Sequence, residues 1–221
     1  MNSKSEQTAM IIDLEWNMFS SVNEGGAKAS CQEDRETFDG MRRAQYEAWS
    51  DKAVQEFLND ISAAAGKNRN LASEKYIHMM KSTFPALYER LIADIPPVSQ
   101  AAAELAQAIS DKMVEQTERL FKEYPYISGS GRPLRSNQDC GEETSIETYQ
   151  LGELYTYSVE TLTALKAHIL ELEENGEALA KIILENTVKF YGYASLEKAE
   201  SDTKERFGEL EISTGCTACE E

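Results

Sequence analysis

The chain has 221 residues, 41% of them hydrophobic, and 39 acidic residues outnumber 22 basic ones, which gives a formal net charge of −17. Nucleic acid and anionic membranes need broad basic surfaces, so this balance argues against both as partners but leaves room for a small anion. No apolar run predicts a membrane span or a secretion signal, and four cysteines are too few for a disulfide scaffold, so we expect a cytoplasmic protein with reduced thiols.

Helical periodicity runs through nearly the whole chain, with apolar residues at steps of three and four and no convincing alternation of the kind found in strands. The sequence therefore predicts an all-α fold, a single-domain multi-helix bundle. In chain order, helices are expected over residues 6–22, 34–49, 52–65, 73–80, 84–95, 100–124, 145–174 and 177–205.

Polar and proline-containing segments set the ends of these helices. Asp34 or Ser30, Ser50 and Ser99 are expected N-caps, and Thr144 with Glu147 forms a predicted capping box. Residues 125–143 read as a polar connector, either disordered or a lid. Residues 1–207 are expected to form the helical domain and residues 208–221 a flexible acidic tail that contains Cys216-x-x-Cys219.

Two charged residues fall in the middle of apolar helix faces. On a helical wheel Glu15 is at the centre of the first apolar stripe, and Arg42 is flanked by aromatic residues with Gln45 beside it. In an antiparallel hairpin both charges lie about two turns from the connector, level with each other. A buried charge needs a partner, so we expect a Glu–Arg pair that either fixes the helix register or serves a site.

The connector between these two helices is unusual for a turn. Gly25 and Gly26 allow positive φ angles or a close approach of the backbone to a ligand, although a helix C-cap also explains them. Free N–H groups near the start of the second helix would favour an anion. Cys31 lies there, either as a nucleophile with a lowered pKa or as a buried structural thiol.

The segments WNMFSSVNEGG, SCQEDRETFDGMRRAQYEAW and GELYTYS resemble the signature of an uncharacterised bacterial and archaeal family, a domain of unknown function. The resemblance covers most of the chain and names no reaction. The family pattern has an arginine directly after the second glycine, where this chain has Ala27 and Lys28. The resemblance implies that these residues belong to the family's motif: Asn23, Gly25, Gly26, Cys31, Gln32, Asp34, Arg42, Gln45, Glu153 and Tyr157.

A second wall of the site is expected on the helix predicted over residues 145–174. Tyr149, Glu153, Tyr157 and Glu160 share the face opposite its apolar stripe, which is either a solvated face or a pocket wall that supplies acid–base groups. In the connector before it, Arg132 is among the best candidates to clamp a phosphate or carboxylate.

Metal sites are weakly indicated. The chain lacks the Glu-x-x-His pairs of di-iron bundles, and the Cys216-x-x-Cys219 pair would need two further ligands to hold zinc. An all-carboxylate site built on Glu15 and Glu153 is conceivable. We therefore assign no metal ligands, and the sequence identifies no cofactor.

Together these features favour an enzyme that acts on a small polar, anionic metabolite by acid–base or thiol chemistry, as a lyase or hydrolase. The alternative is a non-catalytic helical ligand-binding sensor or adaptor. The predicted catalytic residues are Glu15, Cys31, Glu153 and Tyr157, and the predicted substrate-binding residues are Asn23, Gly25, Gly26, Gln32, Arg42, Gln45 and Arg132.

Overall fold

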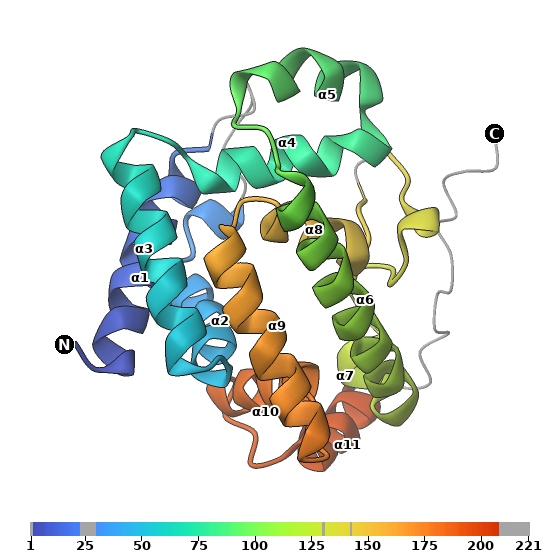
Figure 1. The fold of residues 1–221 in the computed structure, drawn as a ribbon. Coiled ribbons are helices and arrows are strands. Elements are labelled where there is room, and N and C mark those ends of the chain that lie inside the picture. Colours follow the sequence, from blue (N-terminus) through green and yellow to red (C-terminus); the bar gives the residue numbers. More distant parts are fainter. Residues whose placement is uncertain (1, 23–29, 130, 142, 208–221) are drawn as a thin grey trace.

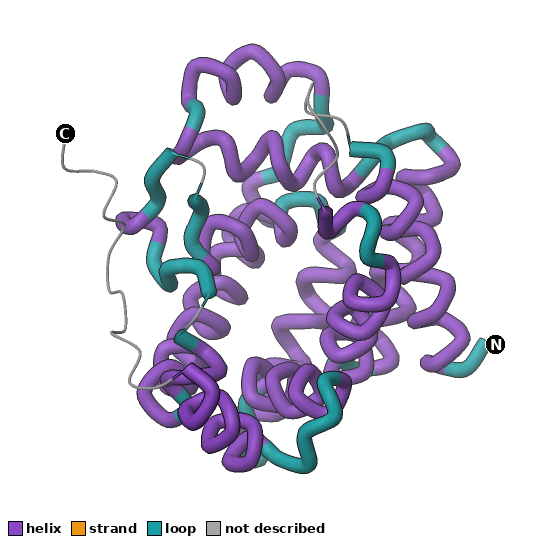
Figure 2. Tube along the Cα trace, turned by 180° about the vertical axis from the view of Figure 1, so that it is seen from behind, coloured by secondary structure: helices purple, strands orange, loops and turns teal. Residues whose placement is uncertain are grey.

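The computed structural model describes residues 2–22, 30–129, 131–141 and 143–207, and the regular elements of this part of the chain are all helices (Figures 1 and 2). Apart from an isolated β-bridge between Cys140 and Glu143, these residues form no β-structure. The all-α prediction is confirmed. Asn23, Gly25, Gly26 and the predicted tail over residues 208–221 lie outside the described residues.

The helices follow one another with short connections. In chain order they are α1 (Lys4–Ser20), η1 (Ser30–Gln32), α2 (Arg35–Ala48), α3 (Asp51–Gly66), α4 (Leu71–Thr83), α5 (Pro85–Leu91), η2 (Ile92–Asp94), α6 (Gln100–Glu123), α7 (Pro125–Ser128), η3 (Ser136–Gln138), α8 (Ile146–Leu154), α9 (Val159–Glu174), α10 (Leu179–Phe190) and α11 (Leu196–Phe207). The predicted connector over residues 125–143 thus contains two short helices, α7 and η3.

Side-chain caps explain where several helices begin. Asp34, Ser50 and Ser99 each accept a hydrogen bond from the backbone N–H three residues later, as predicted for α2, α3 and α6. The cap of α8 is Ser145, so the predicted capping box at Thr144 is wrong by one residue.

The prediction of one helix over residues 145–174 is wrong, because the chain turns between α8 and α9. Ser158 caps α9, and its backbone N–H donates to Asp60 Oδ2 of α3 at 2.9 Å. The Thr161 hydroxyl donates to the same oxygen at 2.7 Å. A carboxylate from a distant helix therefore holds this turn in place.

The helix predicted over residues 177–205 is also divided, into α10 and α11. Gly192 lies between them with a φ of 87°, a left-handed conformation that glycine adopts without a steric penalty.

The helices surround a central volume. α4 and α5 lie across one end of the molecule, at the top of Figure 1, and α7, α10 and α11 gather at the other end. Between the ends, α1 packs on α2 and α3, α9 packs on α3 and α6, and α8 packs on α4 and α6. The main hydrophobic core is formed mostly by α1, α2, α3, α6, α8 and α9, with Leu71 of α4 and Leu179 of α10, and a smaller cluster joins the end of α6 to α10 and α11.

The contact between α4 and α8 depends on a glycine. A Cβ atom at Gly152 would lie 2.8 Å from Met79 Cγ and 3.0 Å from the carbonyl oxygen of Lys75. The close approach brings the polar side chains of α8 next to those of α4.

No helix in the described part of the chain is long and apolar enough to cross a bilayer. Cys31 is a free thiol, whereas Cys140 is disulfide-bonded. The expectation that the thiols are all reduced is therefore wrong for Cys140. The cytoplasmic location stays a prediction.

Candidate functional site

A buried ionic cluster joins three helices around Arg42. The Arg42 guanidinium of α2 forms a two-point contact with Glu153 of α8, with Nη1–Oε1 at 2.9 Å and Nη2–Oε2 at 3.2 Å. Its Nη2 atom also lies 3.0 Å from Glu15 Oε1 of α1. The expectation that Glu15 and Arg42 face each other is confirmed, and Glu153 joins them as a third member.

Two neutral side chains complete the shell of Glu153. The Gln45 amide accepts a hydrogen bond from Arg42 Nη1 at 2.8 Å and donates to Glu153 Oε1 at 3.3 Å. The Tyr157 hydroxyl, in the turn after α8, donates to the same oxygen at 2.9 Å. The predicted residues Gln45, Glu153 and Tyr157 therefore meet in one network. Glu160 is exposed and lies outside it, since the turn before α9 breaks the predicted helix face.

Lys75 of α4 also belongs to the cluster, and the sequence analysis missed it. It is 5% exposed, its Nζ lies 3.5 Å from Glu153 Oε2, and it donates to the Tyr149 hydroxyl at 2.7 Å. The signal was present, because Lys75 falls between Leu71 and Met79 on one buried face of α4. It is the same kind of signal that marked Glu15 and Arg42.

The cluster shifts the pKa values of its two carboxyl groups in opposite directions. Burial raises the pKa of Glu15, nearby Glu153 adds to the effect, and Arg42 offsets only part of it. Burial would also raise the pKa of Glu153, but Arg42 and Lys75 outweigh it and lower that pKa well below its usual range. Two carboxyl groups with oppositely shifted pKa values are a frequent arrangement in acid–base sites.

The Tyr46 hydroxyl is the neighbour of Glu15 inside the core. Neither Glu15 Oε2 nor the Tyr46 hydroxyl has a partner of normal hydrogen-bond geometry among the described residues, but the two interact, and the phenol offsets part of the rise in the pKa of Glu15. Burial raises the pKa of Tyr46 well above its usual value, so this phenol stays protonated.

The cluster forms part of the wall of a large cavity. The cavity has a volume of about 820 Å³ and is lined by residues of η1, α1, α2, α3, α4, α6, α7, α8, α9 and α10. Its volume falls in the range of small-molecule sites, roughly 300–1,000 Å³. Glu15, Arg42, Gln45, Lys75 and Glu153 line it at one place, and most of the remaining wall is aliphatic or aromatic.

Two further predicted site residues also line this cavity. Cys31, in η1, is exposed and free. Arg132 of the connector donates through Nη1 to the carbonyl and hydroxyl oxygens of Thr144, at 3.0 and 2.7 Å. The structure thus brings Cys31 and Arg132 to the same cavity as the buried cluster.

The sequence of the chain matches the model of a family of proteins of unknown function, DUF4125, over residues 6–201. The chain belongs to this family. The match confirms the resemblance to a domain of unknown function that covers most of the chain. No curated protein and no solved structure matches the chain.

Other predicted contacts in this DUF4125 chain have structural roles. The Gln32 amide donates to the carbonyl oxygens of Phe19 and Val22, both at 2.9 Å, and so ties η1 to the end of α1. The Asp34 carboxylate accepts from the Thr37 N–H at 3.0 Å. The protein's own carboxylate therefore takes the place at the start of α2 where an anion was expected.

Neither carboxylate of the cluster is arranged around a metal. Within the described residues, no group of three or more His, Cys, Asp or Glu side chains is placed to hold a metal ion. Arg42 contacts both Glu15 and Glu153, and so occupies the position that a metal bridging the two carboxylates would need.

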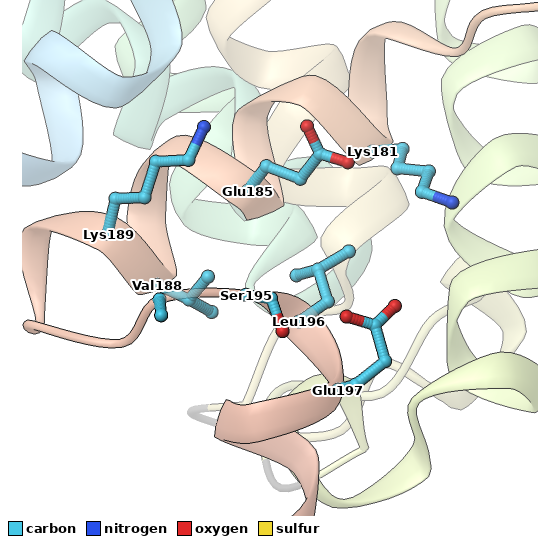
Figure 3. Close-up of a pocket in the computed structure, with 8 residues that line it drawn as sticks. Lys181, Glu185, Val188, Lys189, Ser195, Leu196 and Glu197 are labelled. Carbon is cyan, nitrogen blue, oxygen red and sulfur yellow. The ribbon is translucent and has the colours of Figure 1, made fainter.

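A second, smaller pocket of about 160 Å³ lies between α10 and α11 (Figure 3). Lys181, Glu185 and Lys189 reach it from α10, and Ser195 and Glu197 line it near the start of α11. It contains none of the predicted site residues and is too small for most metabolites. The larger cavity is therefore the candidate site.

Proposed function

We propose that the chain is an enzyme that binds a small organic molecule in the 820 Å³ cavity and acts on it by proton transfer, as a lyase or hydrolase. The observation that carries this proposal is the state of Glu15. Its carboxyl group is buried, has a raised pKa and lines the cavity beside Arg42 and Glu153. These are the properties of a general acid.

The remaining residues of the cluster favour the protonated form of Glu15. Glu153 stays ionised because Arg42, Gln45 and Tyr157 all bond to it, and its negative charge helps Glu15 keep its proton. Burial raises the pKa of Tyr157 well above its usual value, so its hydroxyl remains a donor. Glu153 and Tyr157 are thus assigned to positioning and electrostatics.

Acid–base chemistry is favoured over thiol chemistry. A cysteine nucleophile needs a base or a lowered pKa. Neither histidine lines the cavity with Cys31, and the cation Arg42 is already bonded to two carboxylates. We propose that Cys31 contacts the ligand without attacking it.

The wall of the cavity also refines the expected ligand. A wholly polar metabolite would leave the aliphatic and aromatic lining unmatched, so we propose a molecule with an apolar body and one polar end. Further, we propose that the Asn-Glu-Gly-Gly and Cys-Gln segments, which contain Asn23, Gly25, Gly26 and Gln32, belong to the family's motif.

One observation favours the non-catalytic alternative. Arg42 and Glu153 satisfy each other almost completely, as in a pair that fixes the register of packed helices. A ligand-binding sensor needs the cavity but not a reactive Glu15.

The test is a substrate screen followed by one substitution. Esters, amides and hydroxy acids with apolar bodies are screened for turnover by the wild type and by Glu15→Gln, with Glu115→Gln on the surface of α6 as control. Loss of a general acid lowers the rate about 10²–10⁴-fold, so Glu15→Gln should lose turnover while Glu115→Gln keeps it. Equal turnover by both variants would rule out the acid. Ligand binding without any turnover would favour the sensor.

A further inference from the structure

Tyr149 lies in a second polar part of the cavity wall, one helical turn before Glu153 on α8. The Lys75 Nζ lies 4.0 Å from the centre of the Tyr149 ring and donates to its hydroxyl at 2.7 Å. The Arg132 guanidinium carbon lies 5.2 Å from the same ring centre. Two cations from separate segments, α4 and the connector, therefore meet at one tyrosine, and all three side chains line the cavity.

Arg132 has N–H groups beyond the one that bonds to Thr144. Its Nη1 donates to the two Thr144 oxygens, and no carboxylate of the described residues pairs with it. An arginine has five N–H donors in a planar fork, and its geometry suits a carboxylate. In a chain with a net charge of −17, a cation beside a cavity with no acidic partner in the described part of the chain is unusual.

The cavity wall carries as many cations as carboxyl groups. Its cations are Arg42, Lys75 and Arg132, and its carboxyl groups are Glu15, Asp34 and Glu153. Burial would lower the pKa of Lys75, but Tyr149 and Glu153 outweigh it and raise that pKa, so Lys75 is charged. The raised pKa of Glu15 shifts this balance toward the positive side, which favours an anionic ligand.

We propose that the ligand is a monocarboxylic acid with an apolar body, and that its carboxylate binds between Lys75 and Arg132 beside the Tyr149 ring. The apolar body then fills the aliphatic and aromatic part of the cavity, and the carbon atoms nearest the carboxylate come next to Glu15 and Glu153. This inference rests on the proposed function, because it names the ligand of the same site.

The geometry favours a carboxylate over a phosphate monoester. A phosphate carries about −1.5 to −2 charges near neutral pH and would place a net negative charge in a largely apolar cavity. A carboxylate contributes one charge, and its two oxygens match the fork of Arg132.

The test compares two probes of the same length by titration calorimetry: decanoate, which has a carboxylate, and the uncharged 1-decanol. The protein variants are Arg132→Gln and the control Arg135→Gln. Arg135 belongs to the same connector, but it pairs with Glu118 at 2.9 Å and does not line the cavity. Arg132 is exposed, so its replacement should leave the fold intact.

Wild type and Arg135→Gln should bind decanoate at least about tenfold more tightly than 1-decanol, and Arg132→Gln should lose most of that difference. If 1-decanol binds as tightly as decanoate, or if Arg132→Gln keeps the preference, the carboxylate proposal is wrong although the apolar cavity stands. If neither probe binds to the folded wild type, this inference is wrong, and so is the proposal that the cavity binds a ligand with an apolar body.

Discussion

Replacing Arg42 with methionine should be the most damaging single change in the buried cluster. The substitution removes the guanidinium that contacts Glu153 at 2.9 and 3.2 Å and Glu15 at 3.0 Å, but it keeps much of the aliphatic volume. Glu153 would remain buried and ionised with only Lys75 nearby. Breaking a buried ion pair in this way costs about 3–5 kcal/mol, a large share of the roughly 5–15 kcal/mol that stabilises a domain.

The same reasoning predicts a very different result for Glu15→Gln. A carboxyl group with a raised pKa adds stability at low pH, and this contribution is lost as the pH rises from the unfolded pKa through the folded pKa. A glutamine keeps the volume of Glu15 and the uncharged form that its raised pKa favours. We therefore expect Glu15→Gln to stay within about 1 kcal/mol of the wild type, or to be more stable.

Double variants identify the true partner of Arg42. Combining Arg42→Met with Glu153→Gln removes the stranded charge and should restore at least half of the lost stability. Combining Arg42→Met with Glu15→Gln should restore little, because Glu153 is still ionised. Arg43→Met is the matched control: this neighbour is exposed and pairs with Glu47 at 3.8 Å, so its loss should cost less than about 1 kcal/mol.

Urea unfolding at pH 7, followed by far-UV circular dichroism, measures each free energy from the midpoint and slope of the transition. The reasoning is refuted if Glu15→Gln is as damaging as Arg42→Met and the Glu15 double variant is the one that recovers. That result would mean that Glu15 is ionised and is the main partner of Arg42, so it could not be the general acid.

Three further predictions concern other parts of the molecule. Gly152→Ala should cost about 1–3 kcal/mol in urea unfolding, because its new methyl group would lie 2.8 Å from Met79 Cγ, whereas Gly66→Ala has no atom within 4 Å and should be neutral or stabilising. Burial lowers the pKa of His78 from 6.5 to about 4, so stability should fall as the pH drops from 6.5 to 4; a thermal melt series should show less of this loss in His78→Gln, and an unchanged profile would contradict it. Cys31 is exposed and free, so iodoacetamide should modify it in the folded protein by mass spectrometry, more slowly when decanoate fills the cavity; an active Cys31→Ser variant would exclude thiol attack.

The buried pair could be predicted because a helical wheel needs only local sequence. Glu15 and Arg42 interrupt apolar stripes, and the distance of each from the connector sets their register. Lys75 gives the same signal on α4 and was overlooked, so its absence from the prediction was not a limit of the sequence.

Other features depend on contacts that no local pattern contains. The turn between α8 and α9 is held by Asp60, which lies 98 residues before Ser158 in the chain. A helical wheel drawn through that turn places Glu160 beside Glu153. In the structure Glu160 is exposed and lies outside the cluster. The cavity is likewise formed by helices from most of the chain, so its size and apolar lining could not be read from any one segment.

The residues of the cluster are synthesised in a fixed order. Arg42 precedes Glu153 by 111 residues, so on the ribosome the arginine emerges well before its two-point partner has been made. Glu15, already synthesised and on the adjacent helix, is the carboxylate at hand during that interval. In the folded protein Glu15 keeps its contact with Arg42, at 3.0 Å, alongside the two-point contact with the later-synthesised Glu153.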